Sequence, residues 1–210
     1  KNAKKLASFL EELYAHVLVM EQIMSTGGGW QDQVGGVTNG IKYITSKPGL
    51  DQQLRVEHIE LQLETKKELN ERFCLIYTRQ RRLARNLLRD VVGRYVGNEP
   101  DSLYALNEIQ KVAALMCFEL ERGKIDEFAD LLNYHWELSR KVDAGSTNTL
   151  IDQIFLSIED LIDAKMVCGA GGGGFLQVIL KKGVQKADVH KRLKDVFQDN
   201  PVDVWNCEII

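Results

Sequence analysis

Apolar residues recur at intervals of three and four over residues 6–24, and this spacing predicts an amphipathic helix. Glu11, Glu12 and Glu21 fall on its polar face. A glycine-rich stretch follows and should end the helix. The apolar positions expected to face inward are Leu6, Leu10, Leu13, Val17, Met20 and Met24.

The next segments read as strands around one short helix. Residues 37–45 predict a strand, and Lys47-Pro48-Gly49 predicts a turn. Residues 55–63 alternate apolar and polar side chains, which predicts a half-buried strand antiparallel to its neighbour. Thr65-Lys66-Lys67-Glu68 has the form of a capping box and should open a helix. The continuous apolar run 73–77 predicts a central strand covered on both faces.

A helical block follows, and the chain closes with further strands. Four helices are expected, at 83–95, from 101 or 102 to before Gly123, from a cap at Asp126, and after the segment 143–148, which is rich in capping residues. The last third reads as strand 165–168, glycine loop, strand 175–180, helix 188–197 and strand 202–209. Strands at both ends of the chain with helices between them predict an α+β fold.

Composition narrows the class of protein. The chain has 210 residues, of which 44% are hydrophobic and 27% charged, as in an ordinary soluble domain or pair of domains. Its net charge of −3 gives no global attraction to nucleic acid or membrane. No apolar run approaches the ~20 residues that span a bilayer. Composition and charge therefore favour neither nucleic acid nor a membrane as a partner.

The cysteines and histidines suggest no metal site. The four cysteines stand far apart inside apolar runs, without a Cys-x-x-Cys pair, as free thiols of a reducing cytosol do. The four histidines are scattered along the chain. We therefore expect a cytoplasmic protein that holds no metal of its own.

Two glycine clusters are the strongest functional signal. The first, residues 25–36, contains five glycines and one ionisable residue, Asp32. It is either a flexible connection between helix and strand or a rigid loop that presents one carboxylate inside a cleft. The second is Gly169-Ala170-Gly171-Gly172-Gly173-Gly174. Two such loops in one chain suggest two walls of one site.

The second cluster is not a nucleotide fingerprint of the common kinds. It matches G-x-G-x-x-G formally, but a strand follows it where a dinucleotide site needs a helix. No Gly-Lys-Ser/Thr closes it, so it is not a P-loop. A glycine loop between strands can expose a row of backbone N–H groups to a phosphate. The alternative is a tight connection without a ligand, although six residues exceed what a hairpin needs.

Two further features allow more than one interpretation. The arginines between Arg79 and Arg94 are either a solvated helix face or a phosphate contact through Arg82 or Arg85. Nucleic-acid binding is disfavoured because a second basic face and interleaved aromatics are missing. Trp30, the one aromatic residue of the first cluster, either packs beneath it or lines a sugar pocket.

These stretches together resemble the GHMP kinases, the superfamily of galactokinase, homoserine kinase, mevalonate kinase and phosphomevalonate kinase. They are Gly28-Gly29-Trp30-Gln31-Asp32-Gln33-Val34-Gly35-Gly36 and the second glycine cluster with Phe175. Within the superfamily the sequence looks most like the L-fucose kinases, including the fucokinase part of bifunctional fucokinase/GDP-fucose pyrophosphorylases. Tyr77-Thr78 and Arg82–Leu88 look like the same family. The resemblance covers essentially the whole chain in the right order.

The resemblance implies transfer of the ATP γ-phosphate, with Mg²⁺, to the anomeric hydroxyl of L-fucose. Asp32 matches the aspartate that takes or orients the hydroxyl proton, and the second glycine cluster, from Gly169 to Gly174, matches a motif beside the triphosphate. Gln31 and Gln33 flank the aspartate and are expected to contact the sugar. The other substrate-binding candidates are Trp30, Arg82 and Arg85.

The resemblance also implies a domain organisation. Residues 1–46 would belong to the edge of an N-terminal domain, and residues 47–210 would form the C-terminal α+β domain. The family's main phosphate-binding loop is absent, so the sequence looks like the C-terminal part of a kinase without its N-terminal half. We expect such a fragment to be inactive alone and to self-associate through exposed apolar surface.

Two other interpretations stay open, and one residue departs from the family. A D-glycero-D-manno-heptose 7-phosphate kinase of the same superfamily would share both glycine motifs. A non-catalytic ligand-binding module with a kinase-like fold is the alternative from another class. Arg79 follows Thr78 where the family usually shows Thr-Gly, and the sequence offers no physical reason for an arginine there.

Overall fold

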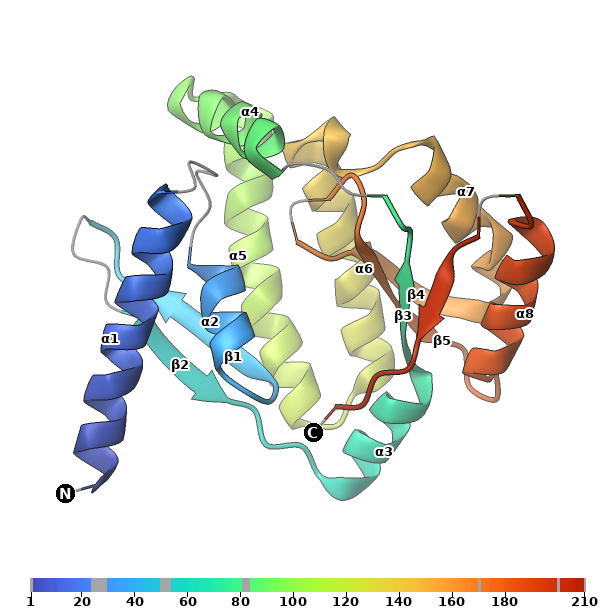
Figure 1. Ribbon diagram of the computed structural model, residues 1–210, viewed down its shortest axis with the longest axis horizontal. Coiled ribbons are helices and arrows are strands. Elements are labelled where there is room, and N and C mark those ends of the chain that lie inside the picture. The colour runs from blue at the N-terminus through green and yellow to red at the C-terminus, as the bar shows by residue number, and fades with distance from the viewer. Residues whose placement is uncertain are drawn as a thin grey trace.

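A computed structural model describes residues 2–23, 30–49, 54–80, 84–169, 171–199 and 201–209. A four-stranded antiparallel sheet lies at its centre, with α7 (Thr149–Ser157) and α8 (Lys186–Val196) on one face. The long helices α5 (Pro100–Glu121) and α6 (Ile125–Val142) cover part of the other face. Figure 1 shows α1 (Asn2–Ile23) and a two-stranded sheet on the far side of α5. The predicted α+β fold is confirmed.

The central sheet has the strand order β4 (Ile162–Val167), β5 (Phe175–Leu180), β3 (Phe73–Tyr77), β6 (Asp203–Trp205). The strand β3 is central, as predicted, but its burial alternates. Cys74 and Ile76 are fully buried towards α7 and α8, whereas Phe73, Leu75 and Tyr77 are only half-buried. The expectation of two fully covered faces was therefore wrong, and one face of β3 stays partly open. The closing strand is also shorter than predicted.

The free edge of β4 is closed by a side chain. The amide of Asn133, on α6, donates to the carbonyl oxygen of Asp163 at 2.7 Å and accepts from the N–H of Lys165 at 3.1 Å. These are the bonds that a neighbouring strand would make, so one asparagine satisfies an edge that could otherwise pair with another chain.

The N-terminal part differs most from the prediction. The first glycine cluster does not lead directly into a strand, because Gln31–Val37 form the helix α2. The strands β1 (Lys42–Ser46) and β2 (Leu54–His58) then pair in antiparallel register. The predicted domain boundary after residue 46 falls in the connection between these two paired strands. The division into two domains stays a prediction.

The remaining helices lie near their predicted positions, but their first residues differ. The helix α3 (Leu63–Arg72) begins before Thr65, which is buried within it, so the predicted capping box does not form. The helix α6 begins at Ile125 after Lys124, and Asp126 makes ion pairs instead of a cap. The capping segment 143–148 behaves as predicted: the Asn148 side chain caps α7. The helix α4 spans Ala84–Val96.

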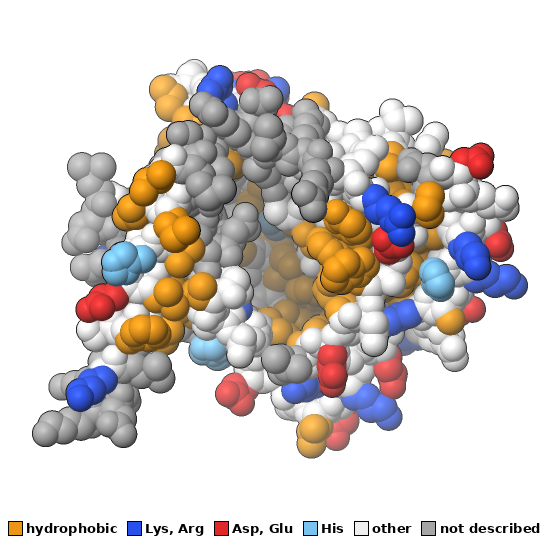
Figure 2. Space-filling model, in the orientation of Figure 1, with side chains coloured by type: hydrophobic (Ala, Val, Ile, Leu, Met, Phe, Trp, Pro, Cys, Tyr) orange, Lys and Arg blue, Asp and Glu red, His pale blue; other side chains and the backbone are white. Residues whose placement is uncertain are grey.

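The helix α1 buries less than its pattern predicts. Leu10, Leu13 and Val17 are half-buried, but Met20 is 61% exposed. Leu6 and Met24 lie outside the described side chains. Figure 2 shows hydrophobic side chains along this helix. Phe9 and Val19 are among its exposed residues. Among the helices of the described ranges, none is long and apolar enough to cross a membrane.

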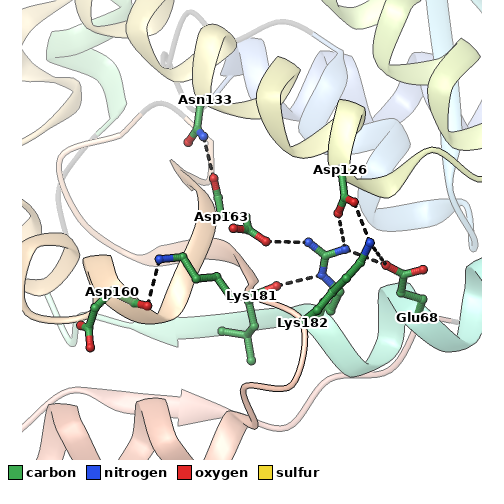
Figure 3. Close-up of polar contacts among 9 residues, drawn as sticks. Glu68, Asp126, Asn133, Asp160, Asp163, Lys181 and Lys182 are labelled. Atoms are coloured by element: carbon green, nitrogen blue, oxygen red, sulfur yellow. Dashed lines mark hydrogen bonds and ion pairs between the residues drawn. The ribbon is translucent and has the colours of Figure 1, made fainter.

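An ion network links α3 to α6 and to β4, the edge strand of the central sheet (Figure 3). Its centre is Arg72, whose side chain is only 4% exposed. The network lies at the end of β3 away from the glycine loop, because Arg72 precedes Phe73 whereas the loop adjoins Tyr77. We therefore assign it to stability.

Candidate functional site

The helix α2 carries the predicted catalytic residue. Asp32 lies in its first turn, after the half-buried Trp30 and the exposed Gln31. Val34 is fully buried and anchors the helix. The side chains of Asp32 and Gln33 lie outside the described residues, so the roles of both stay predictions.

Lys42 stabilises the C-terminal end of α2, a helix that contains two glycines. Its ammonium donates to the carbonyl oxygens of Thr38 and, at 3.4 Å, of Gly35, which belong to the last turn of the helix. A cation at a helix C-terminus satisfies unpaired carbonyls and matches the helix dipole. Partial burial lowers the pKa of Lys42. This cap, from a residue only four and seven positions further along the chain, offsets the poor helix propensity of glycine.

The second glycine cluster is seated against two other segments. The N–H of Gly172 donates to the carbonyl of Ser146 at 2.8 Å, and the N–H of Gly174 donates to the carbonyl of Gln80 at 2.9 Å. Gly171 has φ +92°, and a Cβ there would lie 2.6 Å from the Ser146 carbonyl oxygen. Only glycine fits this approach of two backbones. Ala170 lies outside the described residues.

This seating limits what the loop can offer an anion. The N–H groups of Gly172 and Gly174 are already paired with carbonyls, so they do not belong to a free row of donors. A phosphate would be left with the other N–H groups of the loop, among them those of Gly169, Gly171 and Gly173. Phosphate binding by the loop stays a prediction.

Asn148 joins the three segments of this site. Its Nδ2 donates to the carbonyl of Gly172 at 2.9 Å and to the side-chain oxygen of Gln80 at 3.3 Å. Its Oδ1 accepts from the N–H of Ile151 at 3.1 Å and so caps α7. Sequence reasoning identified Asn148 only as part of a capping segment, because nothing in its neighbourhood reveals contacts with residues 24 and 68 positions away.

Asn148→Asp should separate these two roles. An aspartate keeps the capping oxygen but loses both donors, so we expect faster hydrogen exchange at Gly172 and Gly174 and unchanged protection at Ile151. Asn148→Ala should also lose the cap, at a cost of about 1 kcal/mol. Amide exchange followed by NMR measures both. Unchanged exchange in the loop of the aspartate variant would show that Asn148 does not brace it.

Arg79 takes a conformation that explains the family difference. Its φ is +58°, and its neighbours Thr78 and Gln80 both pair with Gly174, so Arg79 is the extra residue of a bulge. A glycine suits such a backbone, which is where the family usually has one. The arginine side chain makes two 2.8 Å hydrogen bonds to the carboxylate of Asp203 on β6. These bonds lower the pKa of Asp203.

The positive φ at Arg79 leads to a testable prediction. Arg79→Gly loses the ion pair but removes the cost of a left-handed L-residue, which is about 1 kcal/mol. Arg79→Ala loses the ion pair and keeps that cost. In urea unfolding the glycine variant should be the more stable of the two. An alanine variant of equal or greater stability would contradict the left-handed backbone.

Aromatic side chains continue the site beyond the loop. Tyr77, Phe175 and Trp205 lie on adjacent strands and contact one another, with ring centroids 4.9, 5.1 and 6.0 Å apart. We call these three residues the aromatic cluster. Figure 2 shows a hollow in this face of the molecule, with hydrophobic side chains gathered on the wall formed by the sheet. The loop, the bulge and the aromatic cluster thus adjoin one another.

The remaining candidates are not placed by the structure. Arg82 lies outside the described residues, and Arg85 lies in α4 with an undescribed side chain.

All four cysteines are free, as predicted, but only Cys74 is fully buried. Burial raises the pKa of the Cys168 thiol, next to the glycine loop, to about 11. A raised pKa keeps this thiol protonated at neutral pH, and the thiolate is the nucleophilic form of cysteine.

Known proteins resemble this chain in sequence and in fold. No family model matches the chain. It is 32% identical over 199 residues to the bifunctional fucokinase/GDP-fucose pyrophosphorylase of Arabidopsis thaliana, covering 95% of this chain and 19% of that protein. It is 32% identical over 184 residues to the L-fucokinase/L-fucose-1-P guanylyltransferase of Bacteroides fragilis, covering 88% of this chain and 19% of that protein. The chain thus spans about a fifth of each curated relative.

Solved structures agree on the fold. Lactococcus lactis galactokinase matches with a TM-score of 0.66 at 13% identity, over 95% of this chain and 59% of that one. L. major mevalonate kinase matches with a TM-score of 0.63 at 13% identity, over 82% of this chain and 54% of that one. The chain therefore has the GHMP-kinase fold. Its sequence resembles the fucokinases within that class, as its glycine motifs predicted.

Proposed function

We propose that this chain is part of an ATP-dependent sugar kinase that phosphorylates the anomeric hydroxyl of L-fucose to give fucose 1-phosphate. The observation that carries the proposal is the 32% identity, over 95% of the chain, to a protein named for its fucokinase activity. The GHMP-kinase fold of galactokinase supports the same class of reaction.

The proposed roles follow from what phosphoryl transfer requires of a protein. The reaction needs an oriented acceptor hydroxyl, an in-line phosphate and stabilisation of charge. Asp32 takes or orients the proton of the anomeric hydroxyl. The loop from Gly169 to Gly174 lies beside the triphosphate, which arrives as its Mg²⁺ complex. Trp30, Gln31 and Gln33 contact the sugar, and Arg82 and Arg85 contact the phosphate.

The described geometry supports a rigid active-site wall. Two carbonyl partners and Asn148 hold the glycine loop against the bulge at Arg79 and the segment before α7. A preorganised backbone is what electrostatic stabilisation of a transition state needs, because no reorganisation is then required during the reaction. A buried Val34 and the Lys42 cap hold α2 in a comparable way.

A substrate panel tests the proposal. Because the chain spans about a fifth of its relatives, the assay uses the protein at its full natural length. With ATP and Mg²⁺, we expect turnover of L-fucose and a phosphate on the anomeric carbon, detected by ³¹P NMR. Turnover of D-glycero-D-manno-heptose 7-phosphate without L-fucose would assign the other sugar. Binding of sugar or ATP without turnover of either would indicate a ligand-binding module.

A further inference from the structure

We propose that the aromatic cluster of Tyr77, Phe175 and Trp205 is a stacking platform for the apolar edge of the acceptor sugar. The inference rests on the proposed sugar-kinase function and adds a specificity element to it. The ligand chemistry is a deoxyhexose, in which a methyl group and ring C–H groups form one continuous apolar edge.

The three rings share one face of the sheet. Tyr77 and Phe175 are direct partners across β3 and β5. Trp205 pairs with Leu75, which lies two residues before Tyr77 and therefore on the same face. This is the half-buried face of β3, opposite Cys74 and Ile76. Register alone thus places the rings together, and their tilted and edge-to-face geometry fixes each ring against the next.

The platform begins where the glycine loop ends. Phe175 directly follows Gly174, and Tyr77 directly precedes Thr78, whose N–H donates to the carbonyl of Gly174 at 2.9 Å. A sugar lying on the rings would therefore have one end at the loop, where the proposed phosphate transfer takes place. The hollow beside this sheet face gives the space for it (Figure 2).

Trp205 is exposed as one of three packed aromatic residues. Trp205 is 50% exposed and lies on β6, an edge strand of the sheet. An exposed aromatic residue on an edge strand favours unwanted pairing between chains. Single exposed apolar residues need no explanation, but three packed aromatic rings beside a hollow form a typical wall of a small-molecule site.

The charged side chains beside the aromatic cluster neutralise one another, which suits an uncharged edge of the ligand. Arg79, two residues after Tyr77, is engaged by the carboxylate of Asp203, two residues before Trp205. The pair neutralises itself, so the platform offers a ligand aromatic surface rather than net charge. The methyl edge of a 6-deoxyhexose suits such a surface, whereas a sugar with a polar group at that carbon would have to lose its hydration without a partner.

The test compares two sugars that differ only at that carbon. L-fucose is the 6-deoxy form of L-galactose, and both are assayed with the full-length protein. For Trp205→Ala we expect the KM for L-fucose to rise about 10-fold or more, with the preference over L-galactose lost and kcat little changed. The KM for ATP should not change. Trp205→Phe should keep most of the preference, and Leu156→Ala, an exposed apolar residue on α7, should change nothing.

Two further measurements keep the test decisive if Trp205→Ala unfolds or if the protein shows no turnover. Trp205→Leu keeps apolar bulk without a ring, so it replaces the alanine variant if that variant unfolds. L-fucose should also quench the tryptophan fluorescence of the wild type more than that of Trp205→Phe, whether or not turnover occurs. Quenching without turnover would support the platform and reject the proposed reaction.

Three results would overturn the platform. One is turnover of L-fucose with an unchanged sugar KM in both Trp205→Ala and Trp205→Leu. Another is a rise in the KM for ATP alone, which would assign the rings to the nucleobase. The third is equal quenching in the wild type and Trp205→Phe.

Discussion

Asp32→Asn should lower kcat for L-fucose phosphorylation by about a thousandfold, because a positioned base contributes two to four powers of ten to such a step. The amide keeps the size of the side chain but can no longer accept the proton of the anomeric hydroxyl. We expect KM values for sugar and ATP to change little, since Val34 anchors α2 and Lys42 caps it in the variant as in the wild type.

The measurement is steady-state kinetics of the full-length enzyme, with thermal unfolding of each variant beside it. Asp195→Asn is the matched control, because Asp195 is an exposed aspartate on α8. It should leave kcat unchanged. Wild-type turnover in Asp32→Asn would remove this carboxylate from the mechanism and leave α2 as a structural element only.

Arg72→Ala should lower the free energy of unfolding by about 3 kcal/mol, the lower end for a broken buried ion pair, because the guanidinium is only 4% exposed whereas its carboxylate partners are 38–57% exposed and stay hydrated. The guanidinium donates to the carbonyl of Leu180 at 2.8 Å and to Glu68, Asp126 and Asp163 at 2.7, 2.7 and 2.8 Å. Without it, three carboxylates face one another around a buried carbonyl. The loss is large because, among the described residues, Arg72 alone bonds to all three carboxylates and also to the Leu180 carbonyl.

Lys182 provides the control for this prediction. It reaches the same network, at 2.6 Å from Asp126, but its side chain is 64% exposed. Exposed ion pairs contribute little because water screens them. In urea unfolding Lys182→Ala should therefore be nearly neutral, whereas Arg72→Ala should be severely destabilised. Equal losses in the two variants would contradict a buried network centred on Arg72.

Sequence reasoning succeeded where the pattern is local and strong. The strands Phe73–Tyr77 and Phe175–Leu180 were predicted with their observed bounds, and α5 and α7 lie within a few residues of their predictions. Continuous apolar runs and helical periods determine these elements almost alone. The resemblance to kinases rested on the two glycine motifs together with Tyr77-Thr78 and Arg82–Leu88, and the fold agrees with it.

The failures arise from contacts between distant residues. Asp126 looked like a helix cap because the sequence does not show that Arg72 lies beside it, 54 positions away. Residues 31–37 looked like a loop for a more local reason: glycine has a poor helix propensity, and the pattern did not reveal the cap from Lys42, only four and seven positions beyond the carbonyls that it contacts. Arg79 had no explanation until Asp203, 124 positions later, was found to hold its side chain. Local propensity loses to such tertiary partners wherever they satisfy a buried or terminal polar group.

The candidate site was predicted in part. The structure brings the glycine loop together with the bulge after β3 and with Asn148, and neither of these was predicted as its support. It also shows that glycine at 171 serves a close backbone approach, whether or not the loop binds a phosphate. The shared site of α2 and the loop stays a proposal.

The most direct test of that proposal is a structure of the full-length enzyme with L-fucose and a non-hydrolysable ATP analogue. The proposal predicts the anomeric oxygen within hydrogen-bond distance of the Asp32 carboxylate, with the γ-phosphate between that oxygen and the loop at Gly169–Gly174. A sugar bound away from α2, or a triphosphate on another face of the protein, would contradict it.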